Sequence, residues 1–170
     1  EVSGPPMKWT DVEEATRPLF EAFKASRLET DVTFAGQYLG GGHIHVGRSI
    51  FDDDPKLLRN LLAHFLNKPY IHAFFEEMGD DQAKNPYRHK QPYLQFEAAL
   101  AEIDGKFVKG EDVTVKDIAE IVLNKPGLKT RYANINLTNL LTNNPPTVEF
   151  RFFRSPSSAR MLADRVEFLF

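Results

Sequence analysis

Residues 36–47 read GQYLGGGHIHVG, and this stretch holds five of the ten glycines and two of the five histidines in the chain. The segment HIHVG alternates between polar and apolar residues, which predicts a β-strand because successive side chains of a strand point to opposite faces. His43 and His45 then share one face, and Ile44 and Val46 share the other. The glycines before the histidines allow a ligand to approach the backbone closely.

Two imidazoles on one face of a strand are suited to binding a metal ion together with anionic oxygens. The same spacing also arises by chance among core or surface histidines, so the pair alone leaves both interpretations open. The remaining histidines are His64, His72 and His89. His64 and His72 lie in segments with a helical pattern, and we expect them to be partly buried or solvated.

A second alternating segment is TVEFRFF, residues 147–153. Glu149 and Arg151 share one face of the predicted strand, and the residues that alternate with them, Val148, Phe150 and Phe152, form the other face. A carboxylate beside a guanidinium could hold a divalent cation and a phosphoryl or carboxylate group. The alternative is an ion pair on a solvated sheet, which contributes little to stability.

The segment RYANINL, residues 131–137, is a third predicted strand. Its polar face would carry Tyr132, Asn134 and Asn136, and asparagine side chains there could orient a substrate or bond to turns. Arg131 begins the segment. Because the turn sequence TNNPP connects this strand to TVEFRFF, we expect the two strands to pair antiparallel.

Helical patterns occupy most of the remaining chain. The predicted helices are 10–23, 52–68, 69–78, 93–103, 114–125 and 157–170, and a polar loop is expected at 79–92. Together these segments predict one α+β domain over 1–170, with a curved antiparallel sheet and helices packed on its outer face.

Three of these helices carry signals at their N-termini. Asp54 precedes Pro55 as a predicted N-cap, and Thr114 precedes Asp117 as a cap three residues away. Thr10 and Glu13 have the spacing of a capping box. In the helix that follows Thr10, the predicted apolar face consists of Val12, Ala15, Leu19 and Phe23. In the helix that follows Asp54, it consists of Leu57, Leu58, Leu61, Leu62 and Phe65.

The composition excludes several classes of protein. The chain has 170 residues, no cysteine and a formal net charge of -3. Disulfides, thiolate metal ligands and a cysteine nucleophile are therefore excluded, and the bulk charge does not favour a nucleic-acid partner. No apolar run is long enough for a membrane span. The absence of cysteine fits a reducing compartment, and we expect a cytoplasmic protein.

The combination of GGGHIHV with VEFRFF resembles the amidoligase family of the carboxylate–amine ligase superfamily, which includes glutamine synthetase and glutamate–cysteine ligase. The resemblance runs from EVSGPP at residue 1 through RYANINL to the closing helix, with the middle helices matched loosely. It implies a catalytic domain like that of glutamine synthetase. It also implies an ATP-dependent ligase that joins a small-molecule or peptide carboxylate to an amine through an acyl phosphate.

The resemblance assigns roles to individual residues. Glu1, His43 and Glu149 would bind the divalent cation, Mg²⁺ or Mn²⁺. His45 and Arg151 would be catalytic and would lie at the ATP phosphates. The substrate would contact Gly41, Gly42, Arg131 and Asn136. In addition, the basic loop at 79–92 could clamp phosphates, with Arg88 as the candidate residue, and a solvated mobile loop is the alternative.

One part of the family pattern does not occur in this sequence. The family carries an earlier strand with a Glu-x-Glu pair, and the chain starts at Glu1 without an initiating methionine. We therefore expect an upstream part, a second chain that supplies the strand within an oligomer or larger assembly, or an inactive protein. Two alternatives to a ligase remain: a non-catalytic scaffold with this fold, and a metal-dependent hydrolase, since His-x-His also occurs in amidohydrolase sites.

Overall fold

The computed structural model describes residues 7–26, 33–34, 37–38, 42–65, 93–129, 133–142, 145–153 and 156–169. Its residues fall into two compact units. One unit comprises residues 43–152, and the other comprises residues 1–42 together with 153–170. The predicted helix 69–78 and the loop 79–92, with His72, His89 and Arg88, lie outside the described residues.

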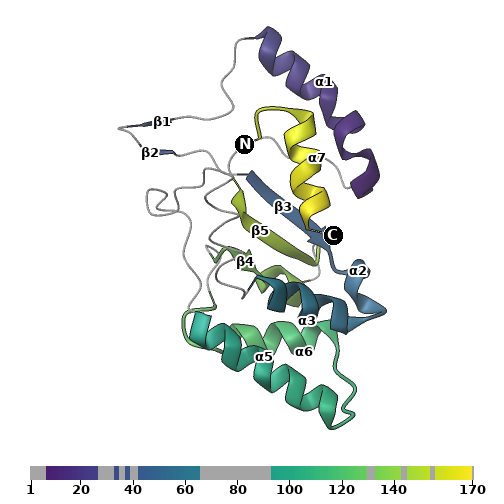
Figure 1. The fold of residues 1–170 in the computed structure, drawn as a ribbon, viewed down its shortest axis with the longest axis vertical. Helices are drawn as coiled ribbons and strands as arrows, with labels where there is room; N and C mark the ends of the chain where they lie inside the picture. The colour runs from purple at the N-terminus through teal and green to yellow at the C-terminus, as the bar shows by residue number, and fades with distance from the viewer. Residues whose placement is uncertain are drawn as a thin grey trace. The chain divides into compact units, whose positions relative to one another are not determined.

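A three-stranded sheet forms the centre of the 43–152 unit. Strand β5 (Thr147–Phe153) lies between β3 (Gly42–Gly47) and β4 (Ile135–Asn136), as Figure 1 shows. β4 is antiparallel to β5, with Ile135 opposite Phe150 and Asn136 opposite Glu149. β3 also runs against β5, because His43 contacts Arg151 while the backbone N–H of Arg48, further along, donates to the carbonyl of Pro146. The α+β prediction and the antiparallel pairing of the two late strands are confirmed.

The strand in RYANINL is shorter than we predicted. Among the described residues it is limited to Ile135–Asn136, with an isolated bridge at Ala133, and the 3₁₀ helix η3 (Thr138–Leu141) follows directly. The side-chain Oδ1 of Asn136 accepts the backbone N–H of Thr138 at 2.9 Å. This local hydrogen bond turns the chain and ends the strand, since asparagine competes with the sheet for backbone donors.

The apolar face of the sheet is buried against helices. The buried residues of this face are Ile44, Val46, Ile135, Val148 and Phe150. The ring of Phe150 is completely buried, and its centroid lies 5.8 Å from that of Phe65, which ends α3 (Pro55–His64). Helix α3 packs in turn against α5 (Tyr93–Val108) and α6 (Val115–Leu123), while α2 (Ser49–Asp52) joins β3 to α3. The sheet therefore has one face covered by this unit's own helices, as alternation along the strands requires.

The caps of α3 and α6 agree with the prediction. Asp54 accepts the backbone N–H of Lys56 at 3.0 Å, and Pro55 occupies the first helical position. Thr114 and Asp117 form a reciprocal capping box. The hydrogen bonds from Thr114 lower the pKa of Asp117 because they stabilise its charged form.

The apolar stripe of α3 is narrower than we predicted. Leu58 and Leu62 are completely buried, whereas Leu57 is 48% exposed. The five predicted positions span more of the helix circumference than one packing surface covers, and Leu57 lies at the edge of that arc. Including Leu57 in the core was therefore wrong.

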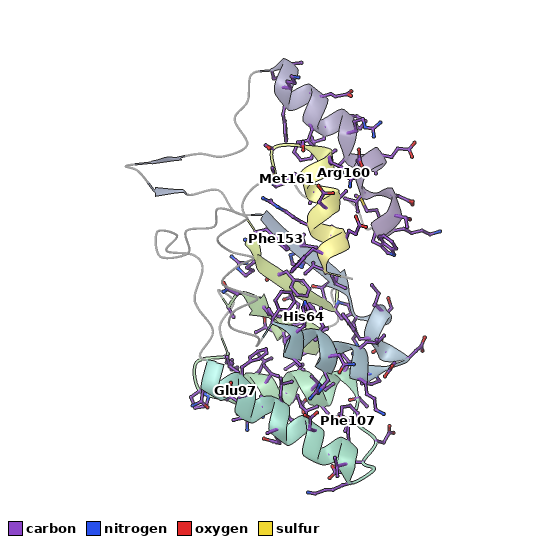
Figure 2. All side chains as sticks on the ribbon, viewed as in Figure 1. His64, Glu97, Phe107, Phe153, Arg160 and Met161 are labelled. Carbon is purple, nitrogen blue, oxygen red and sulfur yellow. The ribbon has the colours of Figure 1, made fainter. Side chains whose placement is uncertain are left out.

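The second unit pairs helix α1 (Val12–Ala25) with α7 (Ala159–Phe168). Figure 2 shows Arg160 on α7, and its Nη1 lies 3.4 Å from Oε2 of Glu13 on α1. The unit also contains a two-stranded antiparallel ribbon, β1 (Thr33–Phe34) with β2 (Gln37–Tyr38), which we did not predict.

The predicted start of α1 was wrong, and its predicted face was right at Val12 and Phe23 only. The short 3₁₀ helix η1 (Trp9–Asp11) precedes α1, and the Thr10 hydroxyl donates to Asp11 at 2.8 Å instead of forming a capping box with Glu13. Ala15 and Leu19 are exposed. The buried and half-buried positions are Val12, Glu13, Thr16, Phe20 and Phe23. The partner helix α7, which is distant in sequence, covers this side of α1 and so decides which face is buried.

None of the helices in the described ranges is long and apolar enough to cross a membrane.

Candidate functional site

Side chains from all three strands gather on the polar face of the sheet. β3 contributes His43 and His45, β5 contributes Glu149 and Arg151, and β4 contributes Asn136. Alternation places the polar residues of each strand on one side, and the pairing of Asn136 with Glu149 aligns β4 with β5. The predicted arrangement of His43, His45, Glu149 and Arg151 on one face is therefore observed.

Glu149 is the centre of this cluster and is 5% exposed. Its Oε1 accepts a hydrogen bond from Nη1 of Arg151 at 2.5 Å and lies 3.2 Å from Nδ1 of His43. The Nε2 of His45 is 3.7 Å from the same oxygen. Its Oε2 accepts a hydrogen bond from Nδ2 of Asn136 at 2.7 Å. A buried carboxylate needs such partners, because burial without them would disfavour its charged form.

Exposure increases from the carboxylate outward. The side chains of Glu149 and Arg151 are 7% and 12% exposed, and that of His45 is 45% exposed. The ion pair is thus shielded from water, which strengthens its electrostatic interaction. The imidazoles form the accessible rim where a solute would meet the cluster.

Two hydroxyl groups support the cluster from within the same unit. The Oγ1 of Thr147 lies 3.1 Å from Nδ1 of His45, so the imidazole presents Nε2 toward Glu149. The Oγ1 of Thr138 donates to Oδ1 of Asn136 at 2.7 Å. Neither threonine was among the predicted site residues. Thr147 alternates with Glu149 on one strand face, and Thr138 follows Asn136 by two residues, so both positions carried a usable signal.

The donors near Glu149 match a divalent cation in part. Two ligands of one cation lie about 3 Å apart when each is about 2.1 Å from the ion, and the 3.2 Å between His43 Nδ1 and Glu149 Oε1 fits this spacing. The described residues, however, contain no group of three or more histidine, aspartate or glutamate side chains arranged to hold a metal. Arg151 would also compete with a cation for Oε1, because its positively charged guanidinium lies next to that oxygen.

Of the other predicted site residues, the structure describes only some. Gly42 begins β3, next to His43. Glu1, Gly41, Arg88 and Arg131 lie outside the described residues, so their predicted roles stay predictions. Asn136 is 3% exposed, and its amide is used within the protein. Its bonds to Thr138 match the predicted alternative of an asparagine that bonds to a turn, whereas its bond to Glu149 was not predicted.

Comparisons of the chain with protein families, with curated proteins and with solved structures find no match.

Proposed function

We propose that the protein is an ATP- and Mg²⁺-dependent carboxylate–amine ligase with a catalytic domain like that of glutamine synthetase, in which Mn²⁺ can replace Mg²⁺. The observation that carries the proposal is the convergence of His43, His45, Glu149 and Arg151 on one face of an antiparallel sheet. A carboxylate, a guanidinium and two imidazoles in one cluster are the groups that such a reaction needs for cation and phosphate binding.

In the proposed reaction, a carboxylate oxygen of the substrate attacks the γ-phosphorus of ATP, and ADP leaves. An amine then attacks the carbonyl carbon of the acyl phosphate, phosphate leaves, and the amine loses a proton. The bound cation would neutralise phosphate charge. The chain's own contribution is positioning and electrostatics, as in other phosphoryl transfers.

Individual residues take distinct roles in this proposal. His43 and Glu149 bind the cation, and their 3.2 Å separation supports this assignment. Arg151 stabilises the transferred phosphoryl group, since its fork can bind two oxygens at once. His45 contributes at the ATP phosphates through the accessible rim. Glu1, Arg88, Gly41, Gly42 and Arg131 remain proposed contacts to cation, phosphate or substrate, and a cytoplasmic location belongs to the same proposal.

The test is ATP turnover by the full chain with Mg²⁺ and a panel of amino acids, peptides and amines. We expect ADP and an amide to form together, and we expect Glu149→Ala to abolish this turnover because the site loses its carboxylate. Arg151→Lys should also be strongly impaired, since an ammonium cannot reproduce the bidentate fork. Arg59→Lys is the matched control, because Arg59 pairs with Asp104 on the helical side of the same unit. Full turnover in Glu149→Ala would remove the proposal.

A second candidate is a non-catalytic scaffold, which one observation favours. Each carboxylate oxygen of Glu149 already accepts a hydrogen bond, one from Arg151 and the other from Asn136, so the carboxylate is satisfied within the protein. A scaffold of this kind would bind neither Mn²⁺ nor ATP and would act as a subunit of a larger assembly. The binding of Mn²⁺ by the wild-type chain, lost in Glu149→Ala, would exclude it.

A further inference from the structure

We infer that Asn136 is a positioning residue that fixes the orientation of the Glu149 carboxylate, and that Thr138 in turn fixes Asn136. The two residues face each other across the β4–β5 pair. Asn136 is 3% exposed and Glu149 is 5% exposed, so water does not compete strongly for their hydrogen bonds.

The hydrogen bonds of Thr138 determine which way the amide of Asn136 points. A backbone N–H can only donate, so the atom of Asn136 that lies 2.9 Å from the N–H of Thr138 must be the oxygen Oδ1. The Thr138 hydroxyl lies 2.7 Å from the same oxygen and donates to it. The other end of the amide, Nδ2, must then face Glu149, where it donates to Oε2 at 2.7 Å.

The consequence concerns the second carboxylate oxygen. With Oε2 held by Asn136, rotation of the carboxylate is restricted and Oε1 is directed at Nη1 of Arg151 and Nδ1 of His43. Without that donor, Oε2 would be buried with one partner fewer, and the carboxylate would turn to find another. Asn136 thus acts through Glu149.

The hydrogen bonds of the Asn136 amide distinguish this positioning role from direct substrate binding. An asparagine amide can form four hydrogen bonds, two at Oδ1 and two at Nδ2. Both positions at Oδ1 are used by Thr138, and one at Nδ2 is used by Glu149. The positioning itself is independent of what the protein does, whereas its effect on catalysis rests on the proposed function.

The first measurement is a nitrogen NMR spectrum of the imidazole groups of the full chain at one fixed pH. The His43 signal is assigned by its absence in a His43→Gln variant. Asn136→Leu removes the amide at similar volume. In this variant we expect the His43 Nδ1 resonance to shift from its wild-type position by most of the difference between the wild type and Glu149→Gln. Thr138→Val should move it less and in the same direction, because the backbone N–H of residue 138 is retained. Asn139→Ala, at a half-buried position in the same 3₁₀ helix, is the control and should leave it unchanged.

The second measurement is steady-state ATP turnover. We expect Asn136→Leu to lower kcat by about tenfold or more, as loss of a supporting group commonly does, with KM for ATP nearly unchanged. If Asn136 had a purely structural role, its substitution would lower the amount of folded protein. The folded part would not show a lower kcat with an unchanged KM.

Each outcome decides a separate point. A wild-type His43 resonance in folded Asn136→Leu would overturn the inference, and if that variant does not fold, an unmoved resonance in Thr138→Val would overturn it. A shifted resonance with wild-type kcat would overturn the catalytic part. Absence of turnover in the wild-type chain would remove the proposed function, while the resonance would still decide the positioning.

Discussion

Glu149 and Arg151 form an ion pair that is largely excluded from water, with side chains 7% and 12% exposed. Such a pair contributes little net stability, because desolvation of both charges offsets their attraction. Removing one partner is costly, since the other charge stays buried. Substitution of either residue should therefore lower the free energy of unfolding. This loss can be measured without metal, separately from cation binding.

Arg151→Met tests whether the guanidinium competes with a cation for Glu149. In the absence of metal, we expect the variant to lose about 3 kcal/mol of unfolding free energy, because an unpaired carboxylate remains buried. Its affinity for Mn²⁺, measured by electron paramagnetic resonance, should rise about tenfold or more, since a positive charge close to the ligand oxygen is removed. ATP turnover should be lost.

The matched control for this prediction is Arg59→Met, which also removes an arginine from a carboxylate, that of Asp104. Its Mn²⁺ affinity should equal that of the wild type. An unchanged affinity in Arg151→Met would show that the guanidinium does not compete with a cation for Glu149.

At the scale of single elements, helices α6 and α3 of the 43–152 unit each begin at a capping residue and bury apolar side chains. Helix α6 is the clearest case: the capping box of Thr114 and Asp117 defines its start, and its buried residues are Val115, Ile118, Ala119, Ile121, Val122 and Leu123. Helix α3 begins equally clearly at Asp54, but its packing surface is narrower.

The cap of α6 predicts a pH dependence of stability. The pKa of Asp117 is lower in the folded protein because Thr114 donates hydrogen bonds to its carboxylate. The resulting stabilisation is fully present above the ordinary aspartate pKa of about 3.9 and is lost as the pH falls through the lower, folded value. Asp117→Asn should therefore be less stable than the wild type by about 0.3–1 kcal/mol at neutral pH, because it removes a negative charge from the first turn of the helix.

Urea denaturation at a series of pH values checks this prediction, and the two proteins should approach equal stability at strongly acidic pH. Asp112→Asn, at an exposed position just before the helix, should behave like the wild type throughout. A difference for Asp117→Asn that stayed constant with pH would contradict the assignment to the charged cap.

Two adjacent leucines on α3 give a second prediction. Leu58 is completely buried and Leu57 is 48% exposed. Leu58→Ala should lower the free energy of unfolding by about 2–5 kcal/mol, because it leaves a cavity, whereas Leu57→Ala should change it by less than about 0.5 kcal/mol. Chemical denaturation of both variants measures the contrast, and equal losses would mean that α3 packs with a different face.

At the scale of the whole molecule, the two compact units differ in how their helices are buried. Only Val12 is classed as buried in α1, whereas six residues are buried in α6. Local stability follows the burial of apolar contacts. The units should therefore open with different free energies, whatever their relative placement.

Native-state hydrogen exchange measures this difference directly. We expect amides of α6 to exchange only with global unfolding of their unit and amides in the middle of α1 to exchange at least about tenfold faster. The comparison uses the full chain under one condition, so the wild-type helices serve as controls for each other. Equal protection of α1 and α6 would show that the α1–α7 pair is as stable as the core of the other unit.

Much of the fold and part of the site follow from local pattern. The alternation in HIHVG and TVEFRFF predicts both strands and the shared faces of His43 with His45 and of Glu149 with Arg151. The caps at Asp54 and Thr114 are also local, because each involves residues only two or three positions apart. These features need nothing beyond the geometry of one strand or one helical turn.

Other features depend on partners that are distant in sequence, and only the tertiary structure decided them. The exposure of Leu57 and the buried side of α1 depend on where the neighbouring helices lie. The contact of Asn136 with Glu149 depends on the register between β4 and β5, since a shift by one residue would turn one partner to the other face. Periodicity within a segment determines which residues share a face, but the pairing of segments determines which faces meet.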